Sequence, residues 1–193
     1  MCGRYTLFTG DDYREMQRIV AEADERAHAQ GATVKTGEIY PTNLAPILLP
    51  GTDGLQAEPA VWGYPGFKGK GVIINARAET ALEKRTFREG VLSHRCVIPT
   101  TGFYEWDASK AKFLFRRPGS GVLYLAGLYQ GSGKQRRYVI LTTAPNASVS
   151  DVHNRMPLIL PDDKLFDWGS DAAWAIEHLR AKMPSLVRSL SGG

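Results

Sequence analysis

Cys2 stands directly after the initiator methionine, and a cysteine at this position can become the first residue of the chain. Once Met1 is removed, Cys2 carries an amine and a thiol on adjacent carbons. An α-amine has a pKa of about 7.7–8.0, against about 10.4 for lysine, so roughly a tenth of it is uncharged at pH 7. Such an amine can condense with an aldehyde to an imine, and the thiol can then close a five-membered thiazolidine ring. The alternative interpretation is an inert cysteine at a frayed terminus.

Three other positions carry side chains suited to binding or proton transfer. Asn75 comes at the polar exit of an apolar stretch, and His153 is a residue type that titrates near neutral pH. Glu105 stands among the aromatic residues of Gly102–Trp106, and loss of water around a carboxylate raises its pKa toward acid–base use. Each position also has an ordinary interpretation: a turn residue, a satisfied hydrogen-bonding histidine and a surface charge beside aromatics.

Composition limits the class of protein. The chain has 193 residues, 43% of them hydrophobic, which is enough for one domain with a substantial core. No apolar run approaches the roughly 20 residues of a membrane helix, and the N-terminus lacks the apolar region of a secretory signal. Two cysteines and four scattered histidines argue against a disulfide framework and a structural zinc site, so we expect a cytoplasmic protein without metal or cofactor. A net charge of +4 leaves nucleic acid open as a partner.

Helices are predicted near both ends of the chain. Apolar residues recur at three- and four-residue spacing over Asp11–Gln30, and Gly31 supplies a C-terminal stop. A second helix is expected over Asp171–Met183, with Ser170 as its N-cap. Three of its side chains should face inward: Trp174, Leu179 and Met183.

The middle of the chain is predicted to form strands. β-Forming residues are concentrated in Gly71–Ile74, Cys96–Ile98, Lys112–Arg116, Val122–Ala126 and Tyr138–Thr143. The turn residues of Pro118–Gly121 predict that Lys112–Arg116 and Val122–Ala126 form a hairpin. Strands in the middle and helices near the ends favour an α+β fold: a single domain over residues 1–193, with a curved, mostly antiparallel, barrel-like sheet and peripheral helices.

Six motifs follow one another along most of the chain. They are Met1–Tyr5, Tyr40–Pro46, Trp62–Tyr64, Asn75–Thr80, the stretch from Arg95–Pro99 through Gly102–Trp106, and His153–Leu160. With cysteine at position two, this ordered set resembles the SRAP family, named for SOS-response-associated peptidases, whose members shield abasic sites in single-stranded DNA. The resemblance implies the SRAP fold, a part in the repair of DNA damage, and chemistry that needs no metal or organic cofactor.

The resemblance also implies roles for the four candidate residues. Cys2 corresponds to the nucleophile that forms a thiazolidine with the ring-opened sugar, and Asn75 to the asparagine that orients the N-terminal residue. Glu105 corresponds to the glutamate that moves protons during imine formation and ring closure. His153 corresponds to the histidine that promotes opening of the sugar. An imine at C1′ acidifies the C2′ proton, so a weak strand-cleaving lyase activity is also expected.

The implied partner is single-stranded DNA with an abasic site, bound by a monomer that is associated with DNA in the cytoplasm. Arg4, Arg77 and Arg155 match positions expected to hold phosphates, a task that suits the guanidinium group. The Tyr40–Asn43 and Trp62–Phe67 segments match the walls around the damaged nucleotide, where Trp62 or Phe67 should stack on neighbouring bases. The remaining expected DNA contacts are Pro41, Asn43 and Trp106.

The sequence departs from the family pattern in two places. Pro65–Lys70 is short and glycine-rich where the family carries another tryptophan, which affects the expected stacking contact. The closing segment of the family is not found before Gly193.

Two other functions stay open at this point. The first is a thiol (auto)peptidase that uses Cys2, His153 and Glu105, with release of Met1 as its minimal reaction. The second is a non-covalent single-strand binder that uses only the arginines and the aromatic residues.

Overall fold

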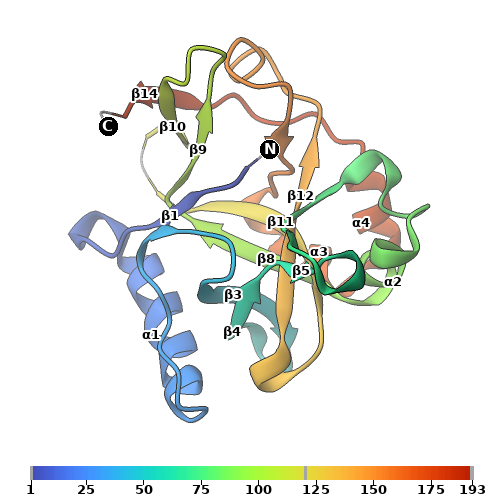
Figure 1. The fold of residues 1–193 in the computed structure, drawn as a ribbon. Coiled ribbons are helices and arrows are strands. Elements are labelled where there is room, and N and C mark those ends of the chain that lie inside the picture. The colour runs from blue at the N-terminus through green and yellow to red at the C-terminus, as the bar shows by residue number, and fades with distance from the viewer. Residues whose placement is uncertain (1, 120, 192–193) are drawn as a thin grey trace.

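Two large sheets organise the chain in the computed structural model, which describes residues 2–119 and 121–191 (Figure 1). Sheet A is antiparallel throughout and has the strand order β14-β10-β9-β1-β2. Its strands are β1 (Tyr5–Leu7), β2 (Gly37–Ile39), β9 (Gly102–Trp106), β10 (Lys112–Arg116) and β14 (Val187–Leu190). The N-terminal strand β1 therefore lies between β2 and β9 rather than at an edge.

Sheet B closes on itself, because β11 pairs with β8 on one side and with β12 on the other. The ring runs β11-β8-β3-β4-β12, and β7 and β13 add to β12. Most of its pairs are antiparallel, but β12 pairs in parallel with β4 and with β7. The strands are β3 (Leu44–Gly51), β4 (Gly54–Trp62), β7 (Asn75–Arg77), β8 (Arg95–Thr100), β11 (Leu123–Gln130), β12 (Arg137–Thr143) and β13 (Met156–Pro157). This closed ring confirms the predicted α+β fold with a curved, mostly antiparallel sheet.

A small hairpin of β5 (Tyr64–Pro65) and β6 (Val72–Ile73) follows β4. Gly63 joins β4 to β5 at a φ of +113°, in the left-handed region that glycine enters without strain. Its backbone N–H donates to the carbonyl of Tyr138 in β12, at 2.8 Å. The turn therefore ties the start of this hairpin to the strand that closes the ring.

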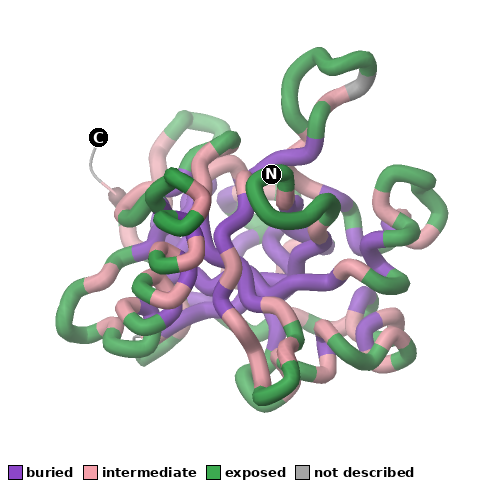
Figure 2. The backbone as a smooth tube through the Cα atoms, turned by 90° about the horizontal axis from the view of Figure 1, so that it is seen from below, coloured by how far each residue is buried: buried purple, intermediate pink, exposed green. Residues whose placement is uncertain are grey.

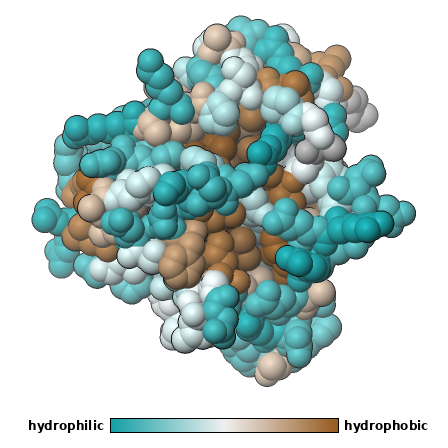
Figure 3. Space-filling model, turned by 180° about the vertical axis from the view of Figure 1, so that it is seen from behind, coloured by the Kyte–Doolittle hydropathy of each residue, from teal (hydrophilic) through white to brown (hydrophobic). Residues whose placement is uncertain are grey.

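Helices cover the ring from outside. The helix α1 (Arg14–His28) buries one stripe of side chains, Met16, Ile19, Ala23 and Ala27, against β3 and β4. On the other side lie α2 (Arg85–Ser93), α3 (Leu165–Ser170) and α4 (Ala172–His178). Figure 2 shows that the buried backbone follows the strands and that the exposed backbone is concentrated in the connections between them. Figure 3 shows apolar side chains gathered in the middle of the rear face, within a hydrophilic rim.

A buried arginine joins the outer helices to the ring. Arg95, at the start of β8, is only 3% exposed. Its guanidinium donates to the carbonyls of Val91 (2.7 Å) and Leu92 (2.6 Å) in α2. It also donates to those of Trp168 (2.6 Å) and Gly169 (3.0 Å) in α3. These carbonyls belong to the last turns of the two helices, where they have no partner within the helix.

The predicted hairpin around Pro118–Gly121 is wrong. Lys112–Arg116 does form β10, but its neighbours are β9 and β14 in sheet A. The next strand, β11, belongs to sheet B, where β8 and β12 occupy both of its edges. The turn residues correctly mark a break between two strands. Here, however, the chain crosses from sheet A to sheet B at this break.

The two predicted helices differ in accuracy. Asp11–Gln30 is confirmed as a 3₁₀ turn over Asp11–Tyr13 followed by α1. The second helix is shorter than predicted, since α4 covers only Ala172–His178. Its N-cap is Asp171, whose carboxylate accepts from the N–H groups of Ala173 and Trp174, and not Ser170, which ends α3. Within residues 2–119 and 121–191, no helix combines the length and the apolar composition needed to cross a membrane.

Candidate functional site

Cys2 lies immediately before β1 and is only 1% exposed. Its carbonyl accepts a hydrogen bond from Nδ2 of Asn75, at 3.0 Å. Its Sγ lies 3.8 Å from the carbonyl oxygen of Arg4, the distance of a weak thiol hydrogen bond. Because Cys2 is buried and precedes an inner strand of sheet A, this residue does not lie in a frayed segment.

Asn75 is brought to Cys2 by the closure of sheet B. It begins β7, whose residues pair in parallel with β12, with Asn75 opposite Ile140. The side-chain amide thereby reaches a residue 73 positions away in sequence. Its Oδ1 is buried and has no hydrogen-bond partner among residues 2–119 and 121–191. Asn75 therefore serves as a positioned amide and not as an ordinary turn residue.

Glu105 and His153 form an acid–base pair in which Glu105 is buried and His153 is partly covered. Glu105 lies in β9 beside β1 and is 2% exposed, and one of its oxygens, Oε2, lies 3.7 Å from Nε2 of His153. Burial raises the pKa of the Glu105 carboxyl above its ordinary value, and His153 opposes that shift. Glu105 is therefore not a surface charge beside aromatic residues.

Backbone contacts hold the ring of His153. The N–H of Arg155 lies 3.1 Å from Nδ1 and donates to it in the tautomer whose ring proton is on Nε2, the nitrogen that faces Glu105. The carbonyl oxygen of Arg155 is also near Nδ1, at 3.3 Å, and would be the partner in the other tautomer. Nδ1 of His153 therefore has two alternative partners in the same residue, the N–H and the carbonyl of Arg155.

The cluster changes the acidity of the cysteine. Burial raises the pKa of the Cys2 thiol well above its usual range, and the negative charge of Glu105 raises it further. The thiol is consequently protonated at neutral pH, unlike the thiolate of an activated cysteine nucleophile. This site therefore favours a reaction in which another group attacks first.

Arg4 immediately precedes β1 and lies against residues that follow or belong to β2 and β9. Its guanidinium is 4.4 Å from the ring centre of Tyr40 and 5.1 Å from that of Trp106, and NH1 lies 3.2 Å from Oε2 of Glu38. The other carboxylate oxygen of Glu38 accepts from Nζ of Lys112, at 2.9 Å. Hydrogen bonds, chiefly from Lys112, hold the pKa of Glu38 at about 2.

The sequence analysis did not identify Glu38 or Lys112. They are 74 positions apart and belong to no motif quoted above. Sheet A brings them together, because β2 and β10 lie on either side of β1 and β9. No signal in the sequence could have paired them without the strand order.

The other two predicted phosphate-binding arginines differ in their surroundings. Arg77 is exposed at the end of β7, and no hydrogen bond or ion pair joins its side chain to another residue in the described part of the chain. Arg155 is largely covered, with 15% of its side chain exposed, and makes two hydrogen bonds to Glu79. Arg77 thus presents its guanidinium to solvent, whereas Arg155 is already committed within the protein.

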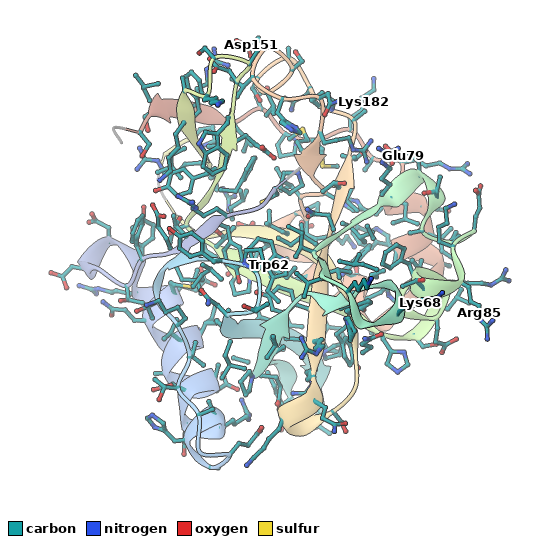
Figure 4. All side chains as sticks on the ribbon, in the orientation of Figure 1. Trp62, Lys68, Glu79, Arg85, Asp151 and Lys182 are labelled. Carbon is teal, nitrogen blue, oxygen red and sulfur yellow. The ribbon has the colours of Figure 1, made fainter. Side chains whose placement is uncertain are left out.

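Trp62 cannot stack on a base, so that prediction is wrong. The side chain is fully buried in the middle of the molecule (Figure 4). Its ring packs edge-on against Tyr5 and parallel to Tyr138, and Nε1 donates to the carbonyl of Ile74. The side chain of Phe67 lies outside the described part of the structure. Trp106 remains half-buried at the surface.

The Tyr40–Asn43 wall is a structured turn. Oδ1 of Asn43 accepts from the N–H of Tyr40 at 3.0 Å, and Pro41 is half-buried. Thr42 has a φ of 74°, a strained conformation for a β-branched residue. The Asn43 side chain is thus used within the turn. Tyr40 is the large apolar side chain that this turn exposes, at 40%.

A second buried pair was not foreseen. The hydroxyls of Tyr5, in β1, and Tyr138, in β12, lie 2.5 Å apart, and neither side chain is exposed. Burial raises the pKa of both phenols. A pocket of about 780 Å³ is also separate from the four-residue cluster, since its lining includes Leu123, His178 and Lys182 but none of the four.

Comparison with known proteins relates most of the chain to one family. Residues 1–188 match the family model described as SOS response associated peptidase (SRAP). The abasic site processing protein YoaM of Bacillus subtilis is 34% identical over 184 residues, which cover 87% of this chain and 78% of that protein. The abasic site processing protein YedK of Escherichia coli is 27% identical over 179 residues, which cover 87% of this chain and 79% of that protein. A crystal structure of a protein from Bordetella bronchiseptica has the same fold, with a TM-score of 0.75, 23% identity, and coverage of 99% of this chain and 100% of that one.

Proposed function

Because the chain belongs to the SOS response associated peptidase (SRAP) family, we propose that it recognises abasic sites in single-stranded DNA and bonds to them through Cys2. Several relatives carry the name abasic site processing protein, which supports a role in handling this lesion. The proposed product is a thiazolidine between Cys2 and the sugar, formed after Met1 has been removed. The linkage shields the lesion until it is repaired.

The chemistry is balanced without a cofactor or an oxidant. The opened sugar presents an aldehyde at C1′, and the amine of Cys2 adds to that carbon. Loss of one water gives the imine, and addition of sulfur to C1′ closes the ring while the thiol proton passes to nitrogen. The net change is one C–N bond and one C–S bond formed, with one molecule of water released.

The observation that carries the proposal is the grouping of three side chains, those of Asn75, Glu105 and His153, near Cys2. Asn75 holds the carbonyl of Cys2, and the Glu105–His153 pair lies beside the same strand. Glu105, with its raised pKa, is suited to give a proton to the departing water and to take one from the attacking groups. His153, with a proton on Nε2, is suited to assist opening of the sugar.

DNA binding is assigned to the surface around this cluster. Arg4, Arg77 and Arg155 would contact phosphates, and Trp106 together with the Pro41–Asn43 turn would bracket the damaged nucleotide. A single strand is the expected substrate because its backbone can bend into the site without the cost of opening a duplex. We expect the protein to act as a monomer.

The raised pKa of the Cys2 thiol favours this proposal over a thiol peptidase. A peptidase of that kind needs a thiolate as its first nucleophile, and burial together with the charge of Glu105 opposes its formation. In the crosslinking reaction the amine attacks first, and the sulfur is needed only when the imine is already in place.

The test is intact-mass measurement of the protein before and after incubation with single-stranded DNA that carries one abasic site. We expect wild type to lack Met1 and to form a heat- and detergent-stable adduct. Cys2→Ala should form none, while Cys96→Ala, which removes the other buried cysteine, should still react. Failure of wild type to form the adduct would refute the proposal in favour of non-covalent binding.

Two further outcomes separate the alternatives. Cys2→Ser should still lose Met1 if processing is external, whereas retention of Met1 would indicate self-cleavage. Cys2→Ala and Cys2→Ser keep an N-terminal amine and can still form an imine, so they should yield relatively more strand cleavage than adduct. Absence of both products from these variants would contradict imine chemistry.

A further inference from the structure

We propose that Glu79 is a positioning residue that holds the ring of His153 in its working tautomer, acting through Arg155. The inference rests on the proposed function for the importance of His153, but its structural part can be measured without DNA. Glu79 lies near the rim of the molecule (Figure 4), within the turn Ala78–Thr80 that follows β7. It does not itself contact His153.

The first step of the connection is a two-pronged ion pair. NH1 of Arg155 donates to Oε1 of Glu79 at 2.7 Å, and NH2 donates to Oε2 at 2.8 Å. NH2 also donates to the carbonyl of Thr142 in β12, at 2.5 Å. The planar guanidinium is therefore fixed at three points on two different segments, and a two-pronged contact of this kind restrains its orientation.

The pair is covered on the side of Arg155 and open to solvent on the side of Glu79. Only 15% of the Arg155 side chain is accessible, although Glu79 keeps 44%. Its hydrogen bonds with Arg155 lower the pKa of Glu79, so the carboxylate stays charged at neutral pH. The charge that Glu79 needs to pair with Arg155 is consequently present at neutral pH.

The second step runs through the backbone of Arg155. Its N–H donates to Nδ1 of His153 at 3.1 Å, while its carbonyl lies 3.3 Å from the same nitrogen. A small rotation of the Arg155 backbone would therefore replace its N–H by its carbonyl as the partner of Nδ1. Nδ1 would then donate a hydrogen bond instead of accepting one. The proton would then leave Nε2, which faces Glu105 at 3.7 Å.

The rest of the loop is held independently of Glu79. The N–H groups of Val152 and His153 both donate to the carbonyl of Val149, at 2.9 Å. Asp151 makes its own pair with Arg188 in β14, at 2.5 and 2.7 Å. Loss of Glu79 should therefore affect the orientation of the imidazole ring and leave the loop folded.

The test compares Glu79→Gln with Asp162→Asn, each in protein labelled with ¹⁵N and free of DNA. Asp162 is a matched control because it pairs with an arginine, Arg117, at 2.6 Å but lies outside the site. The ring spectrum reports which imidazole nitrogen carries the proton, and His153→Gln assigns the signal among the four histidines. We expect a proton on Nε2 in wild type and Asp162→Asn, and a mixture of tautomers in Glu79→Gln.

A second variant and a kinetic measurement complete the test. Arg155→Lys keeps the charge but loses the two-pronged contact, so it should give the same mixture of tautomers as Glu79→Gln. At saturating abasic DNA, Glu79→Gln should crosslink about tenfold more slowly than wild type, as expected when a reacting group is slightly misplaced. Its affinity for a non-reactive tetrahydrofuran oligonucleotide should not fall more than about twofold below that of wild type.

Two results would overturn the inference. One is an unchanged His153 spectrum in Glu79→Gln. The other is a loss of DNA affinity with an unchanged rate at saturation, which would mean that Glu79 only presents Arg155 to a phosphate. If the tautomers respond as expected but wild type forms no adduct, the positioning role stands and the proposed function fails.

Discussion

Replacement of Arg77 by glutamine should weaken DNA binding in a way that salt reveals. Of the three arginines assigned to phosphates, Arg4 is paired with Glu38 and Arg155 with Glu79, whereas Arg77 is exposed and has no ion-pair partner in the described part of the chain. It lies two residues from Asn75, which contacts Cys2 directly. A phosphate that reaches Arg77 therefore displaces no internal carboxylate.

The expected size of the effect follows from counterion release. Each phosphate neutralised on a single strand contributes about 0.7 to the slope of log K against log salt. Loss of one contact should make this slope shallower by about 0.7. When salt is raised from 50 to 200 mM, the affinity of wild type should therefore fall by a factor about 2.6 times larger than the affinity of Arg77→Gln. The absolute affinity at low salt should fall in the variant.

The assay is fluorescence anisotropy with a single-stranded oligonucleotide that carries a tetrahydrofuran residue, which lacks the aldehyde and cannot crosslink. Arg18→Gln is the matched control, since Arg18 is exposed on α1 and its replacement changes the net charge equally. An equal change of slope in the two variants would show that only net charge matters. No change in Arg77→Gln would refute the assignment of this contact.

Three further predictions concern buried or paired charges. Glu38→Gln removes the carboxylate that pairs with both Arg4 and Lys112. Because both cations are then available to a phosphate, affinity for the tetrahydrofuran oligonucleotide should rise by about twofold to fivefold. Weaker binding would mean that Glu38 chiefly holds Arg4 in place. Arg95→Met leaves four helix-end carbonyls without their donor, so urea unfolding should show a loss of about 3 kcal/mol, and a loss below about 1 kcal/mol would contradict this. Burial raises the pKa of Glu105 in the folded protein above its ordinary value of 4.5. The stabilisation from protonated Glu105 is therefore complete below pH 4.5, and it is lost as the pH rises through the pKa of the folded protein. Glu105→Gln should therefore gain thermal stability over wild type as pH increases from 4 to 8, and a gap that narrows over this range would show the opposite sign.

Local patterns in the sequence were sufficient for single elements but not for their partners. The spacing of apolar residues located α1, and the β-forming stretch Tyr138–Thr143 corresponds to β12. The turn at Pro118–Gly121 was equally clear, yet the strands around it pair in different sheets. Strand pairing is decided by competition among all available edges, and β9 and β14 hold both edges of β10. No local pattern contains that information.

The same distinction applies to the site. Cys2, Asn75, Glu105 and His153 each have a chemical character that residue type reveals, and the family resemblance brought them together on paper. Their supporting residues have no such signal. Glu38 and Glu79 are ordinary acidic residues in sequence, and only the folded chain places one against Arg4 and the other against Arg155. Trp62 was misassigned for the opposite reason, because an aromatic residue in a motif is as suited to a core as to a surface, and here it packs between Tyr5 and Tyr138.

In the proposed crosslinking reaction, the order of bond formation would follow from the position in which Cys2 is held. A thiol whose pKa is raised by burial and by Glu105 is a poor first nucleophile, whereas an α-amine is partly uncharged at neutral pH. Once an imine has formed, its carbon is electrophilic and lies one bond from the amine, so even a protonated thiol meets it at a very high effective concentration. The same burial that slows the thiol also protects it from oxidation and from unrelated electrophiles. A variant that exposes or acidifies the Cys2 thiol should therefore lose selectivity for aldehydes before it loses reactivity, and alkylation by iodoacetamide at pH 7 would measure that loss directly.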